Sequence, residues 1–528
     1  MTDITASEHP SQGQSAVPFR NWLAVFGGVL GAFMAVLNIQ VVNASLADIQ
    51  GALGASIDEG SWISTSYLIA EIIVIPLTGW LSQVFSIKRY ILGNVILFVA
   101  FMIAGGFAWN LEVMIVLRAL AGFFGGALIP VAFTIILTKL PPAKQMIGFA
   151  LFGLTATQAP SVGPALGGWL TDNYGWQYIF YIQIIPGVMM FMLLLRGLDD
   201  EPMQLNLLRK GDWLGIGLMA TGLAAFELML EEGNRENWFD SEFIVKTAWI
   251  AAIFLTAFVV LQMRRKEPLV NLRLFADRNF TVGSGINTIL GMGLFGTVFL
   301  VPKYLAQIQG YSPFQIGEVM MWLGIPQLFM VPIVLRLSAK VDTRYLLAFG
   351  CLVFAASCFM NIHMTADSAY SQMVWSNVVR AISMPFIMQP VSGVATANIP
   401  PAQAGSASGL FNVMRNLGGA VGISMVGLIL TVREHFHSNI ITEHLSLLEP
   451  ATQERIAALT QRFVSLGSGS ELAQMRALAA IDGIMRRESN IMAFSDCFYA
   501  MGVAFLVGFL FCFLLKKVEP GSGAPGAH

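Results

Sequence analysis

The chain has 528 residues, of which 55% are hydrophobic and only 12% are charged. Soluble domains carry about 25% charged residues, so this composition excludes an ordinary soluble protein and indicates one that crosses a membrane many times. The 30 basic and 32 acidic residues leave a net charge of −2 and form no single basic patch, which argues against a nucleic-acid partner.

The apolar segments, taken in chain order, predict the membrane crossings. Residues 1–21 form a polar tail without the features of a cleaved signal peptide. About 20 apolar residues are needed for each crossing. On that basis, fourteen spans are predicted near residues 22–43, 62–82, 90–109, 112–138, 146–170, 177–196, 213–231, 245–263, 281–304, 313–336, 344–363, 372–396, 404–432 and 493–515.

These spans suggest an all-α membrane protein with a 6+2+6 arrangement. Residues 22–197 would form one six-helix bundle, 211–264 two inserted helices and 281–515 a second bundle, followed by a tail at 516–528. An even number of spans places both termini on one side. With the N-terminus inside, eighteen Lys and Arg residues fall in inner segments and three in short outer loops, which predicts that both ends are cytoplasmic.

A direct repeat supports two related halves. Leu140-Pro-Pro-Ala143 recurs 259 residues later as Ile399-Pro-Pro-Ala402, and each copy is followed by a Leu-Phe pair. Each also follows a span with a lone arginine, Arg118 or Arg380. Parallel halves related by an axis along the membrane normal explain this pattern. The alternative is chance recurrence of a short loop sequence.

Two charged residues lie deep within predicted spans. Arg118 is the only charge in the apolar run 113–130, where an arginine costs roughly 2.5–3.5 kcal/mol unless it faces water or a partner. Glu71 is about 15 Å from either end of its span, at 1.5 Å per residue. We expect Glu71 to face a central cavity, where it titrates or attracts cations; the alternative is a protonated carboxyl bonded between helices. Both residues indicate a transport path.

Other intramembrane charges receive different interpretations. Arg380 and Arg415 are predicted to be cavity charges that pair with a carboxylate or an anionic substrate. Asp496 and Glu318 lie near outer ends of spans, where interfacial solvation explains them. Glu227 lies near the end of the seventh span, outside the six-plus-six core, and no role in proton coupling is expected for it.

The fifth span carries an unusual pattern of small residues and prolines. Ala159, Gly163 and Gly167 are four residues apart and leave a groove for close helix approach. Pro160 and Pro164 bend the helix, and Gly168 follows directly. Tight packing alone would explain the groove. Together with Arg118, however, the pattern resembles the antiporter motif of the major facilitator superfamily, whose kinked fifth helix is thought to seal the path between the halves.

Further segments resemble the fourteen-span drug:proton antiporters of that superfamily, in particular the EmrB-like exporters. They are residues 37–46, 62–63, 75–81, 168–180 and 274–280. The resemblance implies efflux of amphipathic toxic small molecules across the bacterial inner membrane by alternating access. It also implies that Arg118 takes part in proton coupling and that the proton gradient drives transport without a cofactor. The partners that it implies are membrane lipids, a periplasmic membrane-fusion adaptor and a TolC-type outer-membrane channel.

The chain departs from the family pattern at two places. The loop between the second and third spans has Gln83 and Ser86 where the family usually has an acid and a glycine. Asn38 stands where the family usually has an aspartate, which could carry a proton. Asparagine cannot titrate. The chain is therefore either arrested in a protonated-like state, or its coupling has moved elsewhere.

Residues 433–492 form a polar outer segment with two predicted amphipathic helices, 452–464 and 471–486. The segment is either a docking element for the adaptor or a solvated cap. His435 and His437 beside Glu434 could bind a metal, although a solvated polar run is favoured. Competing functions are a proton-coupled importer, an exporter of one metabolite, lipid or siderophore, and a non-transporting sensor or scaffold. A membrane-embedded enzyme would need a catalytic cluster that the sequence does not show.

Overall fold

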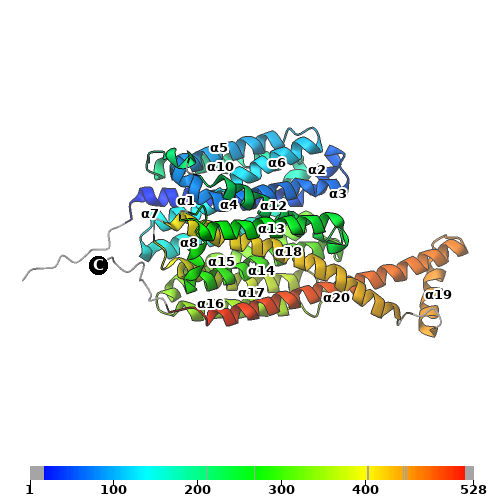
Figure 1. Cartoon of the computed structure of the whole chain (residues 1–528). Coiled ribbons are helices and arrows are strands. Elements are labelled where there is room, and N and C mark those ends of the chain that lie inside the picture. Colours follow the sequence, from blue (N-terminus) through cyan, green and yellow to red (C-terminus); the bar gives the residue numbers. More distant parts are fainter. Residues whose placement is uncertain are drawn as a thin grey trace, which may run out of the picture.

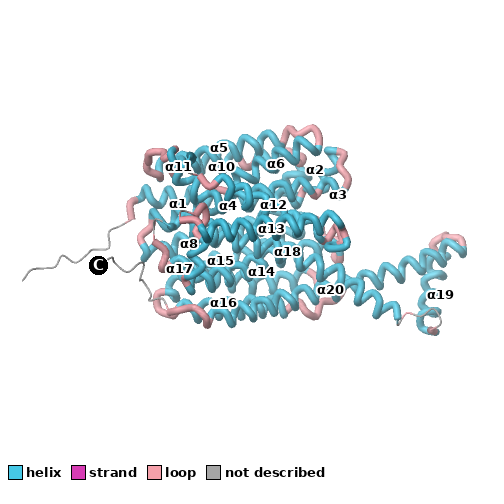
Figure 2. The backbone as a smooth tube through the Cα atoms, in the orientation of Figure 1, coloured by secondary structure: helices cyan, strands magenta, loops and turns pink. Residues whose placement is uncertain are grey.

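The computed structural model describes residues 17–517 except 210, 267, 401–402, 444 and 446–448. In these ranges the chain forms helices and loops without any strand (Figure 2). The helices of the first half are α1 (Phe19–Ala44), α2 (Leu46–Leu53), α3 (Ile57–Gly60), α4 (Trp62–Phe85), α5 (Ile87–Gly105), α6 (Leu111–Gly126), α7 (Leu128–Lys139), α8 (Pro142–Tyr174), α9 (Tyr178–Tyr181), α10 (Ile184–Gly197) and α11 (Asn206–Arg209). The inserted pair is α12 (Trp213–Gly233) and α13 (Glu242–Arg264).

The remaining helices belong to the second half of the chain. They are α14 (Arg278–Gln307), α15 (Pro313–Ser338), α16 (Thr343–Phe359), α17 (Tyr370–Thr396), α18 (Ala404–Glu443), α19 (Pro450–Ser465) and α20 (Ser470–Cys512). Helices dominate because a chain in lipid must satisfy its backbone hydrogen bonds within itself. Side-chain caps mark several helix starts, as where Asp277 accepts a hydrogen bond from the backbone N–H of Phe280 at α14.

Among the described residues, twelve helical segments are long and apolar enough to cross a membrane. The two other predicted spans correspond to α8, a 33-residue helix with two internal prolines, and to α16, an apolar helix of 17 residues. Every predicted span thus coincides with a helix, and the number of crossings, fourteen, stays a prediction. The span predicted at 112–138 consists of α6 and α7, which meet at Ala127.

The helices of each half pack mainly against one another (Figure 1). In the first half, α1 contacts α7, α8 and α10, and α6 contacts α4 and α5. In the second half, α14 contacts α17, α18 and α20. The halves meet where α8 packs against α15 and α17, and where α4 and α7 pack against α18. The repeated loop motif lies just before α8 and α18, although Pro401 and Ala402 of its second copy are outside the described residues.

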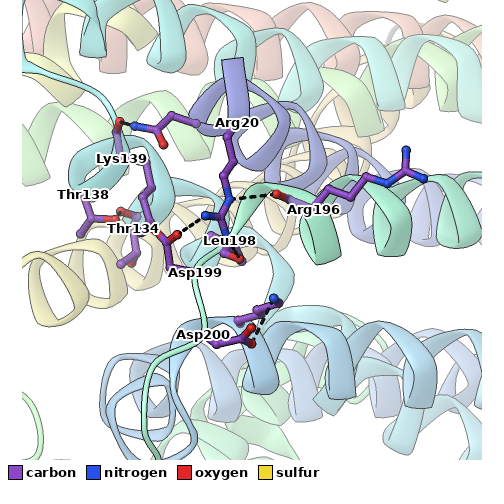
Figure 3. Close-up of polar contacts among 10 residues, drawn as sticks. Arg20, Thr134, Thr138, Lys139, Arg196, Leu198, Asp199 and Asp200 are labelled. Atoms are coloured by element: carbon purple, nitrogen blue, oxygen red, sulfur yellow. Dashed lines mark hydrogen bonds and ion pairs between the residues drawn. The ribbon is translucent and has the colours of Figure 1, made fainter. Parts of the chain in front are cut away.

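The start of α1 and the end of α20 lie at the same end of the helical body (Figure 1). A polar cluster at that end joins α1, α7 and the segment after α10 (Figure 3). Asp199 pairs with Arg20 at 2.6 Å and with Lys139 at 2.9 Å, and Lys88 pairs with Asp200 at 3.1 Å. The hydrogen bond and charge of Lys139, together with the charge of Arg20, lower the pKa of Asp199. The basic side chains gather at the end that the charge distribution assigns to the cytoplasm.

The polar outer segment differs in part from its prediction. The predicted helix 452–464 lies within α19, but the predicted helix 471–486 is not separate, because it is the first part of α20 and continues into the last span. No proline interrupts residues 470–512, so one 43-residue helix forms. Similarly, α18 continues past its predicted span to Glu443. Figures 1 and 2 show α19 and the adjoining ends of α18 and α20 projecting from the helical body.

At the base of this projection, polar side chains pair with one another. Asp496 accepts one hydrogen bond from Nε of Arg433 at 2.6 Å and contacts His437 at 2.7 Å. Asp496 is therefore ion-paired rather than simply solvated at the interface. Because His437 faces Asp496, it does not form a metal site with His435 and Glu434. In the described ranges no group of three or more His, Cys, Asp or Glu side chains is placed to hold a metal ion.

Candidate functional site

Arg118 is enclosed by protein in the middle of the first bundle. Its side chain is 1% exposed. Nε donates to the carbonyl of Ile63 at 3.1 Å, one terminal nitrogen donates to Oδ1 of Asn38 at 2.5 Å, and the guanidinium lies 4.3 Å from the centre of the Tyr67 ring. The structure thus gives this charge partners inside the bundle, as its depth in an apolar run requires.

Glycines on α6 allow α4 to approach Arg118 closely. A Cβ on Gly122 would clash with the backbone carbonyl oxygen of Tyr67, and a Cβ on Gly126 would lie 2.9 Å from Cα of Glu71. Larger residues at these positions would push α4 away. The glycines therefore let the part of α4 that carries Tyr67 and Glu71 pack directly against α6, which carries Arg118.

Asn38, at the position where the resemblance predicts an aspartate, lies next to Arg118. It is fully buried, and its Nδ2 donates to the sulfur of Met102 at 3.2 Å. An aspartate here would form an ion pair with Arg118. The neutral amide keeps the hydrogen bond but leaves the charge of Arg118 uncompensated at this position, so residue 38 cannot carry a proton.

Glu71 lies at the seam between the two halves. It is 4% exposed, and its Oε1 accepts a hydrogen bond from Nδ2 of Asn416 on α18 at 3.4 Å. Its Oε2 is buried and has no hydrogen-bond partner among the described residues. Such an oxygen is costly to bury in the ionised form unless a proton, water or cation satisfies it.

Glu71 lines a narrow cavity together with residues from both halves. Its walls come from α1, α4, α7, α12, α14 and α18, and Arg415 of α18 is among them. Nε of Arg415 is also buried without a partner in the described part of the chain, and its guanidinium lies 5.4 Å from the centre of the Phe152 ring. A carboxylate and a guanidinium from opposite halves therefore face the same space.

The cavity offers about 60 Å³ to water. That space holds a few water molecules, whereas pockets for drug-sized ligands have about 300–1,000 Å³. In this conformation the site can accept protons and water, and a larger molecule requires the halves to separate.

Arg380, the second predicted cavity charge, is not among the residues that line this cavity. It is 1% exposed and donates to Oδ1 of Asn377 at 3.1 Å. Its guanidinium lies 5.7 and 5.8 Å from the centres of the Phe354 and Phe498 rings. These rings stabilise the buried cation, although its Nε and one terminal nitrogen have no hydrogen-bond partner among the described residues.

The small residues of the predicted antiporter motif face two different helices. Gly163 faces Gln40 of α1, and a Cβ on Gly167 would lie 2.8 Å from the carbonyl oxygen of Val41. Gly168 faces Pro313 of α15, where a Cβ would lie 2.7 Å away. Ala159 is fully buried, and Pro160 and Pro164 lie within α8 without ending it. The motif thus places α8 tightly between α1 of one half and α15 of the other.

Hydrogen bonds reinforce the contact between α8 and α15. Thr157 donates to Oε1 of Gln327 at 2.7 Å, and Nε2 of Gln158 donates to the carbonyl of Gly324 at 2.7 Å. They join the two halves next to the motif. The segment predicted to seal the path thus packs closely against α1 and α15, with polar contacts beside it, and its sealing role stays a prediction.

Two site residues were missed by the sequence reasoning. Glu227 and Glu231 of α12 line the same cavity as Glu71, although Glu227 was expected to lie outside the core. The placement differs because α12 packs against both α4 and α18. The sequence did carry one signal for this pair: Glu227 and Glu231 are four residues apart, which puts both carboxyls on one face of a helix.

Comparison with known proteins agrees with this architecture. The profile of the Major Facilitator Superfamily matches residues 28–423. The fold is also that of the human organic anion transporter MFSD10, with a TM-score of 0.59 over 93% of this chain and 99% of that chain at 12% identity. The chain belongs to the major facilitator superfamily and is a multi-pass membrane transporter rather than an enzyme.

Curated relatives narrow the assignment. The chain is 31% identical to the colistin resistance protein EmrB of Acinetobacter baumannii, covering 94% of this chain and 97% of that protein. It is 32% identical to the fatty acid resistance protein FarB of Neisseria gonorrhoeae, covering 96% and 98%, and 30% identical to the multidrug export protein EmrB of Escherichia coli, covering 94% and 96%. Within the superfamily it is an EmrB-like exporter of the bacterial inner membrane.

Proposed function

We propose that the protein exports amphipathic toxic small molecules in exchange for protons, by alternating access of its two halves. The observation that carries the proposal is Glu71, a buried carboxyl with an unpartnered oxygen in a cavity between the halves. The relatives named for resistance to colistin or to fatty acids support a substrate that combines apolar surface with charge.

Glu71 and Arg415 provide the coupling in this proposal. An ionised Glu71 on α4 attracts the guanidinium of Arg415 on α18, whereas a protonated Glu71 does not. The protonation state thereby biases the relative positions of the two halves. A cationic group of the substrate competes with the proton for the same carboxylate, so proton and substrate each alter the other's affinity. Arg118 holds α4 in position through Ile63 and Tyr67.

Transport by the purified protein in liposomes with an imposed pH gradient tests this function. Ethidium serves as the cationic probe, and inverted and right-side-out orientations separate export from import. Glu71→Gln should lose uphill transport but retain exchange at equal pH. Glu242→Gln, which changes an exposed carboxyl at the start of α13, is the matched control. Normal transport by Glu71→Gln with an unchanged pH dependence would exclude Glu71 as the carrier.

Position 38 tests where the coupling resides. We propose that Glu71 has taken over the role of the family aspartate, so the chain with Asn38 should already couple. Asn38→Asp would then add a second proton-binding group beside Arg118. If substrate-driven proton release occurred only after this substitution, the natural chain would instead be arrested in a protonated-like state.

We also propose that the projection formed by α18, α19 and α20 contacts a periplasmic membrane-fusion adaptor, which leads to a TolC-type outer-membrane channel. Large apolar side chains are exposed there, including Leu466 at 71% and Met475 at 61%. Exposed apolar surface of this kind is typical of protein contacts. Deletion of residues 440–485 should abolish co-purification with the adaptor, and undiminished association would exclude this segment.

A further inference from the structure

The inserted helix α12 lies in the seam between the halves. Toward the cytoplasmic end, α4 and α18 touch directly, because a Cβ on Gly79 would lie 2.9 Å from the carbonyl carbon of Gly405. Toward the opposite end, α12 lies against both of them. Ser424 of α18 donates to the carbonyl of Leu230 at 2.9 Å, and Thr65 of α4 donates to Glu232 at 3.4 Å.

Three carboxyl groups follow one another in depth along this seam. Glu231 and Glu227 lie about 3 and 9 Å from the outer end of α12 at Gly233, and Glu71 lies about 14 Å from the outer end of α4, at 1.5 Å per residue. All three line the same cavity. Glu227 is 4% exposed, and its Oε2 is buried without a hydrogen-bond partner among the described residues. Glu231 is more exposed than Glu227.

Few cations balance these carboxyls. Of the charged side chains in the cavity wall, α18 contributes Arg415 and α4 contributes Glu71. At the outer mouth, Glu232 pairs with Arg235 at 2.8 Å. The neighbouring α13 carries no titratable side chain between Lys246 and Arg264, and Asp240 lies in the short turn Trp238–Asp240 at the outer end. Behind Glu71, the guanidinium of Arg118 on α6 is the second cation whose charge acts on this carboxyl. Three ionised carboxylates against two guanidiniums would still be costly in an enclosed site, so the cluster favours bound protons.

We infer that α12 is the periplasmic proton entrance of this transporter, in which Glu231 and Glu227 pass protons through cavity water to Glu71. In each step a protonated carboxyl gives up its proton and the next carboxylate accepts it, so no other reactant is needed. The cavity has room for a few water molecules, which would bridge the carboxyls. The inference rests on the proposed proton coupling. It assigns the inserted helices a role in transport beyond that of membrane anchors.

Glu227→Gln is the decisive variant, because it keeps the shape of the side chain and removes its titration. In liposomes with ethidium, we expect gradient-driven transport to slow by about tenfold or more, on the scale of a lost proton-transfer group, while exchange at equal pH is retained. Glu227→Asp should restore part of the gradient-driven rate, and Glu242→Gln should behave like the natural chain. Infrared titration of the protein without substrate should lose one titrating carboxyl band in Glu227→Gln.

The outcomes separate this inference from the proposed function. If the natural chain shows no gradient-driven transport, the proposed function fails. If the natural chain is driven by the gradient and Glu227→Gln matches it in rate and infrared titration, the proton entrance is wrong. A weaker affinity for ethidium at every pH with intact coupling would make Glu227 a substrate-binding group instead. If Glu227→Gln also loses exchange at equal pH, it has a folding defect and does not test the inference. The gradient-driven rate of Glu231→Gln and the titrating infrared band of Glu227→Asp then decide whether α12 carries protons.

Discussion

The contact between Gly79 of α4 and Gly405 of α18 predicts that Gly79→Ala opens the cytoplasmic end. A Cβ at position 79 would lie 2.9 and 3.0 Å from the carbonyl carbon and oxygen of Gly405, whereas ordinary contacts begin near 3.4 Å. The obstacle is backbone, so α4 and α18 must move apart. Overpacking of this kind costs about 1–3 kcal/mol. The cost falls only on the state that is closed at this end, so the ratio of closed to open protein should drop about 5- to 150-fold.

Cysteine labelling measures this shift. Ser82 is 6% exposed and lines a hollow beside Gly79 and Gly405, so a cysteine at position 82 reports opening. The four natural cysteines are buried and give little background. A water-soluble maleimide, added to inverted vesicles, should label the Gly79→Ala protein at least about fivefold faster. Gly93→Ala is the control, because a Cβ there would meet no atom within 4 Å. Unchanged labelling and transport in Gly79→Ala would refute the proposed closure.

Two further predictions concern stability. Asp199→Asn should lower the melting temperature slightly near neutral pH, because it removes the pairs with Arg20 and Lys139, which are partly exposed. Since these partners lower the pKa of Asp199, the difference should vanish as the pH falls through that pKa, and a difference that grows in acid would contradict the assignment. Phe354→Ala should destabilise the protein by about 3–5 kcal/mol, because its ring stacks on Phe505 with centroids 3.6 Å apart. Thermal unfolding measures the loss, and Leu352→Ala on the same helix, where the side chain is 41% exposed, is the control. Equal losses in the two variants would refute the stacking argument.

The positions of the helices could be predicted from the sequence because the energy that selects them is local. An apolar run in lipid must form a helix wherever it occurs, since its backbone has no other hydrogen-bond partners. The depths of Glu71 and Arg118 followed from counting residues along each helix. The long helices α18 and α20 were harder to foresee, because a polar segment can continue a helix when no proline stops it.

The candidate site required the tertiary structure. Glu71 and Asn416 are 345 residues apart, and no periodicity in either helix shows that they meet. Glu227 illustrates the same point: its depth was readable, but its position opposite Glu71 depends on how α12 packs between α4 and α18.

The sequence by itself determined the membrane helices, their charge-based orientation and the family, because hydrophobicity, backbone hydrogen bonding and short motifs act along the chain. Only the tertiary structure decided which charges share a cavity. That arrangement depends on steric fit between helices, as where glycines of α6 and α18 admit the backbone of α4, and such fit is a property of two surfaces rather than of either sequence alone.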